Sequence, residues 1–586
     1  MKKRPYFAGI LLLVALLLVG GTTMAQKDTV RLRQEVEVTK AYQPTILDAV
    51  KINDIPKIKP EQSELPTFDY SIYSKPVFST FDVTPVTAAK MVGDQRPEMG
   101  NGLLKLGFGN YLSPYGEFFY NAQPDKKSNF GMHFKHLSSS GDISLLNGDF
   151  VKAPQSVNGA ELFGKRFFKK STLSGSLAYD RKAFNYYGYT GDRLSDIQKE
   201  QMIPFLGDKQ YFSKGTLDVH LKSETLSGDD FTYDFGVNYH YLTSKTGQKE
   251  GQAIVSADLG KKFGNMFGIL NFSMISYNAD SILSRISHTV GGKHQMLMNI
   301  SPSVKWQSQT ASFQAGLTTT VVQDDDTDGG IYFYPKVKAE WSPVRQVLTL
   351  FVGADGHMRH NTWSTIAAEN PYVDPYHDVK NSRTQVVVSG GFKGKLSPKT
   401  NFVAETSYSV VKDQHFYVLY GTDIYNISAV GPRSLNNTFD WLYDDVNIFK
   451  ISGEVLHAVS DNFSLHLLGN YYSYNMKTLE KAWQMPNFDV TFSGVYKPTD
   501  QLKFSADIYV IGSKTALLSE PISSSKPSMM IEMDPIIDLN VGGEYQFSDK
   551  INFFVKLNNL GFQKYEQWLG YTNKGFNTLV GASYKF

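Results

Sequence analysis

The chain has 586 residues, of which 41% are hydrophobic, 20% charged and 13% aromatic, and its formal net charge is +2. A charge so close to zero gives no support to nucleic-acid binding. The sequence has no cysteine, which excludes disulfides, thiolate metal sites and a lipid-attachment cysteine. Because no apolar run of about 18 residues follows residue 26, no membrane helix is expected there.

Residues 1–25 have the pattern of a secretory signal peptide. Lys2, Lys3 and Arg4 precede the apolar run GILLLVALLLVGG, and residues 23–25 supply the small side chains that cleavage requires. The alternative, a membrane anchor, is disfavoured because the apolar run is short. We therefore expect export, with loss of three cations from the mature chain.

Residues 26–100 form a proline-rich segment. This segment contains seven of the 24 prolines, namely Pro44, Pro56, Pro60, Pro66, Pro76, Pro85 and Pro97. Proline lacks a backbone donor and fixes φ, so a continuous sheet is not expected. Apolar residues still recur, as in YSIYSKPVFSTF. We predict an extended periplasmic segment that lies on a larger body.

Residues 101–586 alternate between apolar and polar positions. In FTYDFGVNYHY, one predicted face carries Phe231, Tyr233, Phe235, Val237, Tyr239 and Tyr241, and the other carries Thr232, Asp234, Gly236, Asn238 and His240. The segments IDLNVGGEYQF and NFDVTFSGVYK repeat this arrangement. A soluble sandwich also alternates, but its apolar face is less often edged by aromatic residues at both ends. The pattern favours an all-β transmembrane antiparallel barrel.

The connections alternate between short turns and long links, a pattern that the architecture of a soluble sandwich does not require. Short turns such as DKKS, FGN, SPKT and TDQ lie between longer links at 186–210, 276–292, 362–382, 414–447, 477–486 and 514–535. Counting hairpins back from Phe586 predicts about 22 strands, with both termini on the short-turn side. Known barrels of this width are kept plugged. We expect the lumen to be partly filled by residues 26–100 and inward loops.

The segment QDDDTDGG is the strongest candidate for a metal site. Asp324, Asp326 and Asp328, followed by Gly329, match the first half of a calcium-binding loop. The second half does not match, because the twelfth position is Pro335. A weak Ca²⁺ site and an exposed polar hairpin loop are the two interpretations, and no other cofactor is predicted.

Three long links contain aromatic clusters, in FNYYGYTGD (184–192), NPYVDPYHD (370–378) and FDWLYDD (439–445). These clusters could bind glycans or a partner surface, but girdle formation and loop self-packing explain them more simply. His357 and His360 are interpreted as a pair at a strand end, since spacing places no third ligand beside them. No G-x-S-x-G, H-E-x-x-H or phosphate-loop motif occurs, so an enzyme is not predicted.

The chain ends on an alternating strand, LVGASYKF. Tyr584 and Phe586 fall on its apolar face, and a strand with a free edge at this point would need a neighbour to cover it. We therefore expect the last strand to pair with the first. The aromatic ending also resembles the insertion signal that the barrel-assembly machinery recognises, which makes that machinery an expected partner.

The segment NNLGFQKY resembles a family signature. Asn559, Leu560, Lys564 and Tyr565 match the pattern N-L-x-x-x-K-Y that precedes the last hairpin of TonB-dependent receptor barrels, although Gly561 stands where that family usually has an aromatic residue. The resemblance covers residues 101–586 and implies an outer-membrane location in a Gram-negative bacterium. EVEVT (35–39) looks like the strand that opens a receptor plug, but about 75 residues are too few for a full plug.

Two functions remain open at this point. The resemblance implies ligand passage or uptake at the cell surface, with the external loops as the receptor. The alternative is a non-transporting barrel that serves as a subunit of a multi-protein outer-membrane assembly, with its N-terminal segment docked on a periplasmic or outer-membrane partner. Both functions place the barrel wall in contact with outer-membrane lipid.

Overall fold

The computed structural model describes residues 101–190, 209–224, 231–280, 292–325, 327–374, 378–420, 437–519 and 528–586, together with the short strands β12 (Ile282–Leu283) and β13 (Thr289–Val290). The predicted signal peptide at 1–25 and the proline-rich segment at 26–100 lie outside the described residues. Those two assignments therefore stay predictions.

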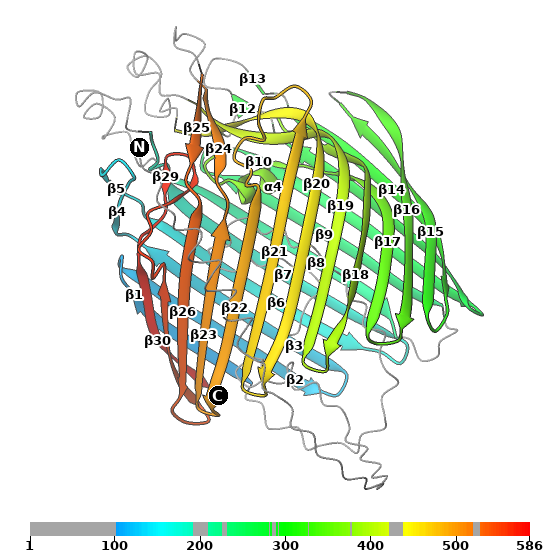
Figure 1. The fold of residues 1–586 in the computed structure, drawn as a ribbon, viewed down its shortest axis with the longest axis horizontal. Helices are drawn as coiled ribbons and strands as arrows, with labels where there is room; N and C mark the ends of the chain where they lie inside the picture. Colours follow the sequence, from blue (N-terminus) through cyan, green and yellow to red (C-terminus); the bar gives the residue numbers. More distant parts are fainter. Residues whose placement is uncertain are drawn as a thin grey trace, which may run out of the picture. The chain divides into compact units, whose positions relative to one another are not determined.

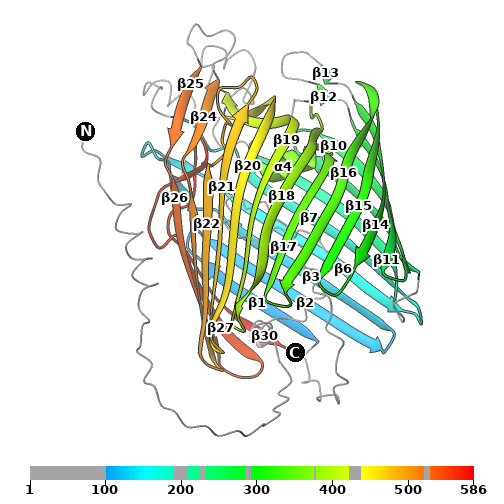
Figure 2. The same ribbon diagram turned by 45° about the vertical axis from the view of Figure 1, so that its right-hand side comes forward.

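The fold is a closed antiparallel barrel of 22 strands, as predicted (Figures 1 and 2). The barrel strands are β1 (Gly102–Gly109), β2 (Ser113–Asp125), β3 (Ser128–Ser139), β6 (Gln155–Phe167), β7 (Ser171–Asn185), β8 (Lys209–Ser223), β9 (Thr232–Ser244), β10 (Lys249–Phe263), β11 (Met266–Ala279), β14 (Lys293–Gln307), β15 (Ala311–Asp324), β16 (Thr327–Val344), β17 (Leu348–Arg359), β18 (Ser382–Ser397), β19 (Thr400–Tyr420), β20 (Phe439–Ser460), β21 (Phe463–Met476), β22 (Phe488–Thr499), β23 (Leu502–Ile511), β26 (Ile536–Gln546), β27 (Ile551–Asn558) and β30 (Asn577–Lys585).

The last strand closes the ring against the first strand. β30 pairs with β27 on one side and with β1 on the other. The Gly102 amide donates to the Phe586 carbonyl at 2.9 Å, and the Phe586 amide donates back to the Gly102 carbonyl at 3.1 Å. This junction between β1 and β30, called the seam below, leaves the last strand without a free edge.

The two faces of the barrel wall differ as the alternation predicted. Phe235, Val237 and Tyr239 of β9 are exposed on the outside, while Asp234 of the same strand lines the interior. Large apolar side chains are exposed on most other barrel strands as well. A closed barrel with an apolar outer face and a polar inner face is the arrangement that spans a membrane. In the described part of the chain, no helix is long and apolar enough to cross a membrane.

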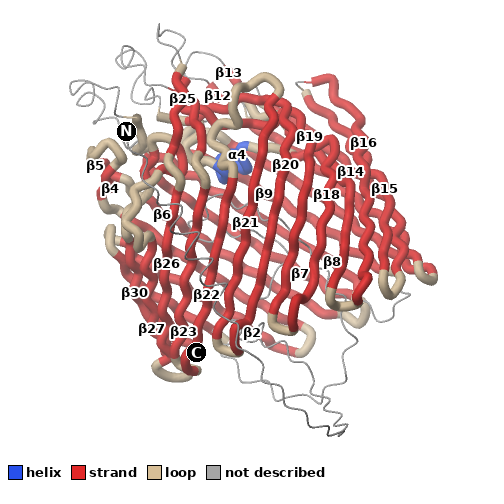
Figure 3. The backbone as a smooth tube through the Cα atoms, in the orientation of Figure 1, coloured by secondary structure: helices blue, strands red, loops and turns tan. Residues whose placement is uncertain are grey.

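The two ends of the barrel carry different connections (Figure 3). Short turns occupy the end that holds Gly102 and Phe586, which we take as the periplasmic end. The external links contain α4 (Trp363–Glu369) and the short strands β4 (Asp142–Ser144), β5 (Phe150–Lys152), β24 (Lys514–Ser519), β25 (Met529–Met533), β28 (Glu566–Trp568) and β29 (Tyr571–Thr572).

One predicted link is shorter in the structure than the sequence suggested. The expected link at 414–447 is strand at both of its ends, because β19 continues to Tyr420 and β20 begins at Phe439. The pairing of β19 with β20 shifts register between Val411 and Gln414 and then resumes. This irregularity breaks the simple alternation and conceals the strand extension from a pattern-based reading.

Candidate functional site

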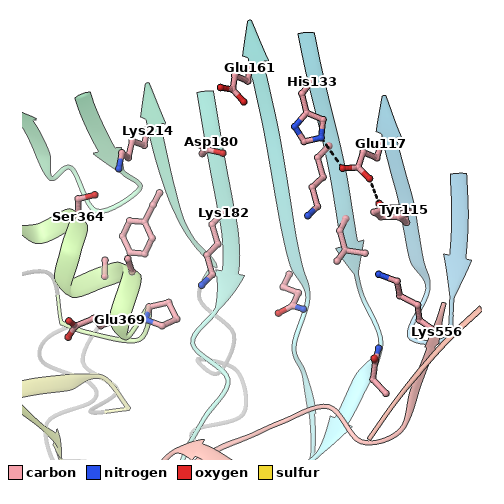
Figure 4. A pocket seen from close by; sticks show the side chains of 18 of the residues that line it. Tyr115, Glu117, His133, Glu161, Asp180, Lys182, Lys214, Ser364, Glu369 and Lys556 are labelled. Atoms are coloured by element: carbon pink, nitrogen blue, oxygen red, sulfur yellow. Dashed lines mark hydrogen bonds and ion pairs between the residues drawn. The ribbon is translucent and has the colours of Figure 1, made fainter. Parts of the chain in front are cut away.

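A cavity of about 2490 Å³ occupies the lumen (Figure 4). Its wall is formed by inward side chains of β1, β2, β3 and β6 to β8 and, around the seam, of β23, β26, β27 and β30. α4 contributes Ser364, Thr365 and Glu369 to the lining, together with Ala367 and Ala368. The cavity is therefore bounded both by barrel wall and by a folded external link.

Charges of opposite sign alternate along one row of the luminal wall. The register partners in this row, in strand order, are Lys105, Glu117, Lys135, Gly159, Asp180 and Lys214. Glu117 accepts hydrogen bonds from the Tyr115 hydroxyl at 2.6 Å and from Nε2 of His133 at 2.9 Å (Figure 4). Such a wall is largely compensated in charge and suits contact with a hydrated or polar solute.

An apolar cluster crosses the external mouth of the barrel, and we call it the loop cap. Its buried members are Phe184, Tyr186, Phe212, Leu242, Trp363, Ile366, Ala367, Val373, Val379, Tyr417, Leu419, Phe439, Trp441, Ala516, Leu518, Met533, Trp568, Leu569 and Tyr571. Some of these residues come from β7 and β8 and others from β19 and β20, on the opposite side of the ring. The cap thus bridges two facing walls.

Aromatic rings form the centre of the loop cap. Tyr372 and Tyr571 stack with ring centroids 3.6 Å apart, and Trp568 contacts Tyr417 at 5.1 Å and Phe439 at 5.6 Å. The Tyr571 hydroxyl donates to the Asn437 backbone carbonyl at 2.6 Å, so this buried hydroxyl has a hydrogen-bond partner. Burial raises the pKa of Tyr372 to about 12 and that of Tyr571 further, so both phenols stay neutral at physiological pH.

The first turn of α4 is tied to the barrel wall by one carboxylate. Glu250 of β10 accepts hydrogen bonds from the backbone amides of Trp363 at 3.0 Å and Ser364 at 2.8 Å, and from the Tyr277 hydroxyl at 2.7 Å. The N-cap residue Thr362 completes the helix start through a capping box with Thr365. These bonds fix where the helix enters the mouth.

The last turn of α4 is held by Glu369. Its carboxylate accepts from Nε2 of His415 at 2.7 Å and from the Tyr417 hydroxyl at 2.9 Å, and it pairs with Arg359. Burial alone would raise the pKa of Glu369, but His415 and Arg359 outweigh it and hold the pKa well below its ordinary value of 4.5. The Glu369 carboxylate is therefore charged at every physiological pH.

Glu369→Gln is expected to weaken the loop cap by about 1–3 kcal/mol at pH 7, because it removes the charge that Arg359 faces. In the unaltered protein the contribution is fully present above pH 4.5 and is lost progressively below that pH, as the pH falls toward the depressed pKa of the folded state. Cap unfolding can be followed between pH 7 and pH 3 by the change in tryptophan fluorescence, to which Trp363 and Trp568 of the cap contribute among the six tryptophans of the chain. The unaltered protein should lose stability in acid, whereas the variant should change little. If the unaltered protein and the Glu369→Gln variant lost stability equally in acid, Glu369 would not hold the loop cap through its charge.

The residues of the predicted calcium loop lie at the β15–β16 turn. Asp324 accepts from the Gln295 amide at 2.7 Å and lies 4.0 Å from the Lys293 ammonium. Asp326 lies outside the described residues, and the Asp328 side chain does too. Among the described residues, no group of three or more His, Asp and Glu is placed to hold a metal. Calcium binding by this turn stays a prediction.

The residues of the family-like motif fold the last external link. Asn559, at φ 53°, donates its amide to the Gln563 carbonyl at 2.8 Å, and its side-chain oxygen accepts from the Gln563 amide at 3.1 Å. Tyr565 is buried, and its hydroxyl donates to Asp538 of β26 at 2.7 Å. The Leu560 amide donates to the Leu539 carbonyl at 2.8 Å. The motif therefore attaches this link to the barrel wall.

The fourth motif residue and the barrel ending lie elsewhere. The Lys564 ammonium donates to the Ser144 hydroxyl of β4 at 2.8 Å, which joins the last link to an earlier one. Tyr584 and Phe586 are exposed on the outer face at the periplasmic end, and their rings stack with centroids 6.2 Å apart. Recognition of these two residues during insertion stays a prediction.

The aromatic links are explained by loop self-packing, since each supplies residues to the loop cap. His360 contacts the Gln252 amide through Nδ1 at 2.7 Å and packs edge-on against Tyr277. The sequence analysis missed the residues that hold α4, namely Glu250, Glu369 and His415. The one available signal was the T-x-x-T capping pattern in NTWSTIAAEN at the start of the helix.

Comparison with known proteins supports the fold. No protein-family model and no curated protein matches the sequence. Among solved structures, the copper transporter OprC has a TM-score of 0.59 at 11% identity and covers 84% of this chain and 81% of its own. The FrpB iron transporter from Neisseria meningitidis has a TM-score of 0.61 at 9% identity, covering 84% of this chain and 82% of its own.

The pyoverdine outer membrane receptor FpvA from Pseudomonas aeruginosa has a TM-score of 0.60 at 10% identity and covers 84% of this chain and 79% of its own. Identities this low bear on the fold alone. The resemblance predicted from Asn559, Leu560, Lys564 and Tyr565 is thereby confirmed at that level. The chain is a β-barrel with the 22-strand architecture of the TonB-dependent receptors.

Proposed function

We propose that this barrel admits a ligand at the cell surface, with the loop cap as the gate between the external medium and the lumen. One observation carries the proposal: a large cavity, lined by charged and polar as well as apolar side chains, lies directly beneath a cap that is built from loops and attached to the wall at both ends of α4. The similar solved structures are named as transporters or receptors, in agreement with a non-enzymatic role.

The gate has a defined mechanical element. α4 is joined to the facing walls by Glu250 of β10 and His415 of β19, so its release would separate contacts on both sides of the mouth. A ligand that bound the outer surface of the cap more tightly in its released form would shift the cap toward opening. The compensated luminal row beneath it would then offer polar contacts to a hydrated ligand.

One observation favours the second function, a subunit of a multi-protein outer-membrane assembly. β1 begins at Gly102, so the segment between the predicted cleavage site and the barrel has about 75 residues, which is short for a complete plug. In that case residues 26–100 would dock on a periplasmic or outer-membrane partner. Only the first function, ligand admission, involves a ligand and requires a source of energy for its passage.

Mild detergent extraction of the tagged protein from native membranes, followed by affinity isolation, separates the two functions. Ligand admission predicts recovery of the barrel without a stoichiometric outer-membrane partner. A partner recovered in a fixed ratio, and lost when residues 26–100 are deleted, would favour the assembly function instead. The matched control is the same barrel with an internal replacement of 26–100 by a flexible linker of equal length, which keeps the spacing but removes the docking sequence.

A further inference from the structure

The strands beside the seam are the shortest in the ring. β1 and β27 have 8 residues each and β30 has 9, whereas β14 has 15 and β16 has 18. At about 3.4 Å per residue and a tilt of about 40°, eight residues rise only about 20 Å, which is less than the roughly 25 Å of a membrane-spanning apolar band. The barrel wall alone therefore falls short of the external lipid boundary at the seam.

Three external links are joined above these strands, at 110–112, 140–154 and 559–576, and we call them the seam collar. Asn110 donates to the Phe576 carbonyl at 2.9 Å and accepts from the amide of Thr578. The Ser140 amide donates to the Tyr111 carbonyl at 2.9 Å. The Leu146 amide donates to the Thr572 hydroxyl at 3.0 Å, so each link bonds another part of the collar or the seam.

The collar has an apolar face on each side. On its inner face Ile143, Leu145, Val151 and Ala153 form a buried cluster with Tyr189 of the β7–β8 link, and Tyr111 packs against this cluster. Its outer face exposes four large apolar side chains, with exposed fractions of 65% for Leu112, 53% for Leu146, 77% for Phe150 and 67% for Phe562. These four side chains therefore present exposed apolar area on links that hydrogen bonds join above the seam.

Two of these exposed residues are held in an unfavourable backbone conformation. Leu112 has φ 47° and Phe562 has φ 52°, in the left-handed region that bulky residues rarely adopt because it strains the backbone. Phe562 packs on the ring of Phe576, with centroids 5.0 Å apart, yet most of its surface remains exposed. Both side chains are thus largely exposed at positions where the backbone is strained.

The exposed collar residues continue the lipid-facing surface of β1. Leu106 and Phe108 point outward on β1 with exposed fractions of 56% and 58%, and Leu112 follows after one short turn. Tyr111, between them, lines the lumen. The outer face of the collar thus begins where the apolar face of β1 ends. At this level the strands do not yet span the full apolar band of the membrane.

We propose that the seam collar inserts Leu112, Leu146, Phe150 and Phe562 into the acyl chains of the outer leaflet, and so completes the apolar band where the strands are too short. The occupant of this surface is lipid, because the surface is continuous with the lipid-facing wall and lies over the seam. Insertion offsets the backbone cost at Leu112 and Phe562 by removing their side chains from water.

The chain has no cysteine, so single-cysteine variants can carry a nitroxide spin label without further substitution. Leu112→Cys, Phe562→Cys and Phe150→Cys are reconstituted in vesicles of phosphatidylethanolamine and phosphatidylglycerol. Collision rates with oxygen, which partitions into lipid, are compared with those of a water-soluble nickel chelate. Leu106→Cys serves as the lipid-facing control, and Glu480→Cys, on an exposed external link, serves as the aqueous control.

All three collar labels should collide with oxygen several-fold more often than with the nickel chelate, as the Leu106 label does. Labels that behave like the Glu480 label would overturn the proposal. The Phe150 label, on the β4–β5 hairpin, also provides an independent readout if a substitution at Leu112 or Phe562 disturbs its turn. The outcome does not depend on the proposed gate, since the labels report on lipid contact alone.

Discussion

Phe439→Ala should open the external mouth of the barrel. Phe439 is fully buried at the centre of the loop cap and contacts Trp568 and Tyr571, with ring centroids 5.6 and 6.0 Å away. Removing a buried phenyl ring typically costs about 3–5 kcal/mol, because the cavity that it leaves is only partly refilled. We expect at least a tenfold rise in the influx of a large hydrophilic antibiotic into cells that carry the variant.

Phe235→Ala is the matched control for this substitution, since it removes the same side chain from the outer face of β9, where the ring is exposed. It should leave influx unchanged while the barrel remains in the membrane at the same level. If the two variants admit the antibiotic equally, the loop cap is not the barrier. A rise that is specific to the Phe439 variant supports the cap as the gate.

Gly581→Ala should prevent closure of the seam. A Cβ at this position would lie 2.2 Å from the Leu106 carbonyl oxygen and 2.4 Å from the Phe554 ring. The carbonyl belongs to the paired backbone of β1 and cannot move without breaking the ladder. Overpacking of this kind typically costs about 1–3 kcal/mol or more. We expect a loss of the folded, electrophoretically compact form of the barrel in unheated detergent samples.

Gly453→Ala in β20 is the control, because a Cβ at that position meets nothing within 4 Å. This variant should fold to the same extent as the unaltered chain, within about 0.5 kcal/mol. Equal folding of the two alanine variants would show that close packing at the seam is not needed for closure. The contrast separates a steric effect from the general effect of replacing glycine in a strand.

The barrel could be predicted from the sequence because lipid constrains every strand in the same way. Residues such as Phe235 and Val237 must face hydrocarbon, while Asp234 must not, so a two-residue period survives along the strands. The alternation of long links with short turns is equally general, because barrels of this kind have long loops at the external end and short turns at the periplasmic end. The seam followed from the ending at Phe586, since an unpaired final strand would have left a free edge.

The loop cap could not be predicted because its contacts join residues that are far apart in the chain. Tyr571 packs against Tyr372 and Phe439, and no periodicity connects these positions. The aromatic clusters in the links were visible, but whether they faced a ligand or one another depended on the closed ring. Glu369 and His415 were likewise indistinguishable from ordinary surface residues until the fold brought them to 2.7 Å.

The accessibility of the lumen from outside the cell tests the central claim most directly. Lys214 faces the cavity beneath the loop cap, so Lys214→Cys places the chain's single thiol inside the lumen. A bulky, membrane-impermeant maleimide added to intact cells should leave this thiol unlabelled, yet it should label Glu480→Cys on the outside within minutes. Labelling of both variants at the same rate would show that the mouth is open and would contradict the account.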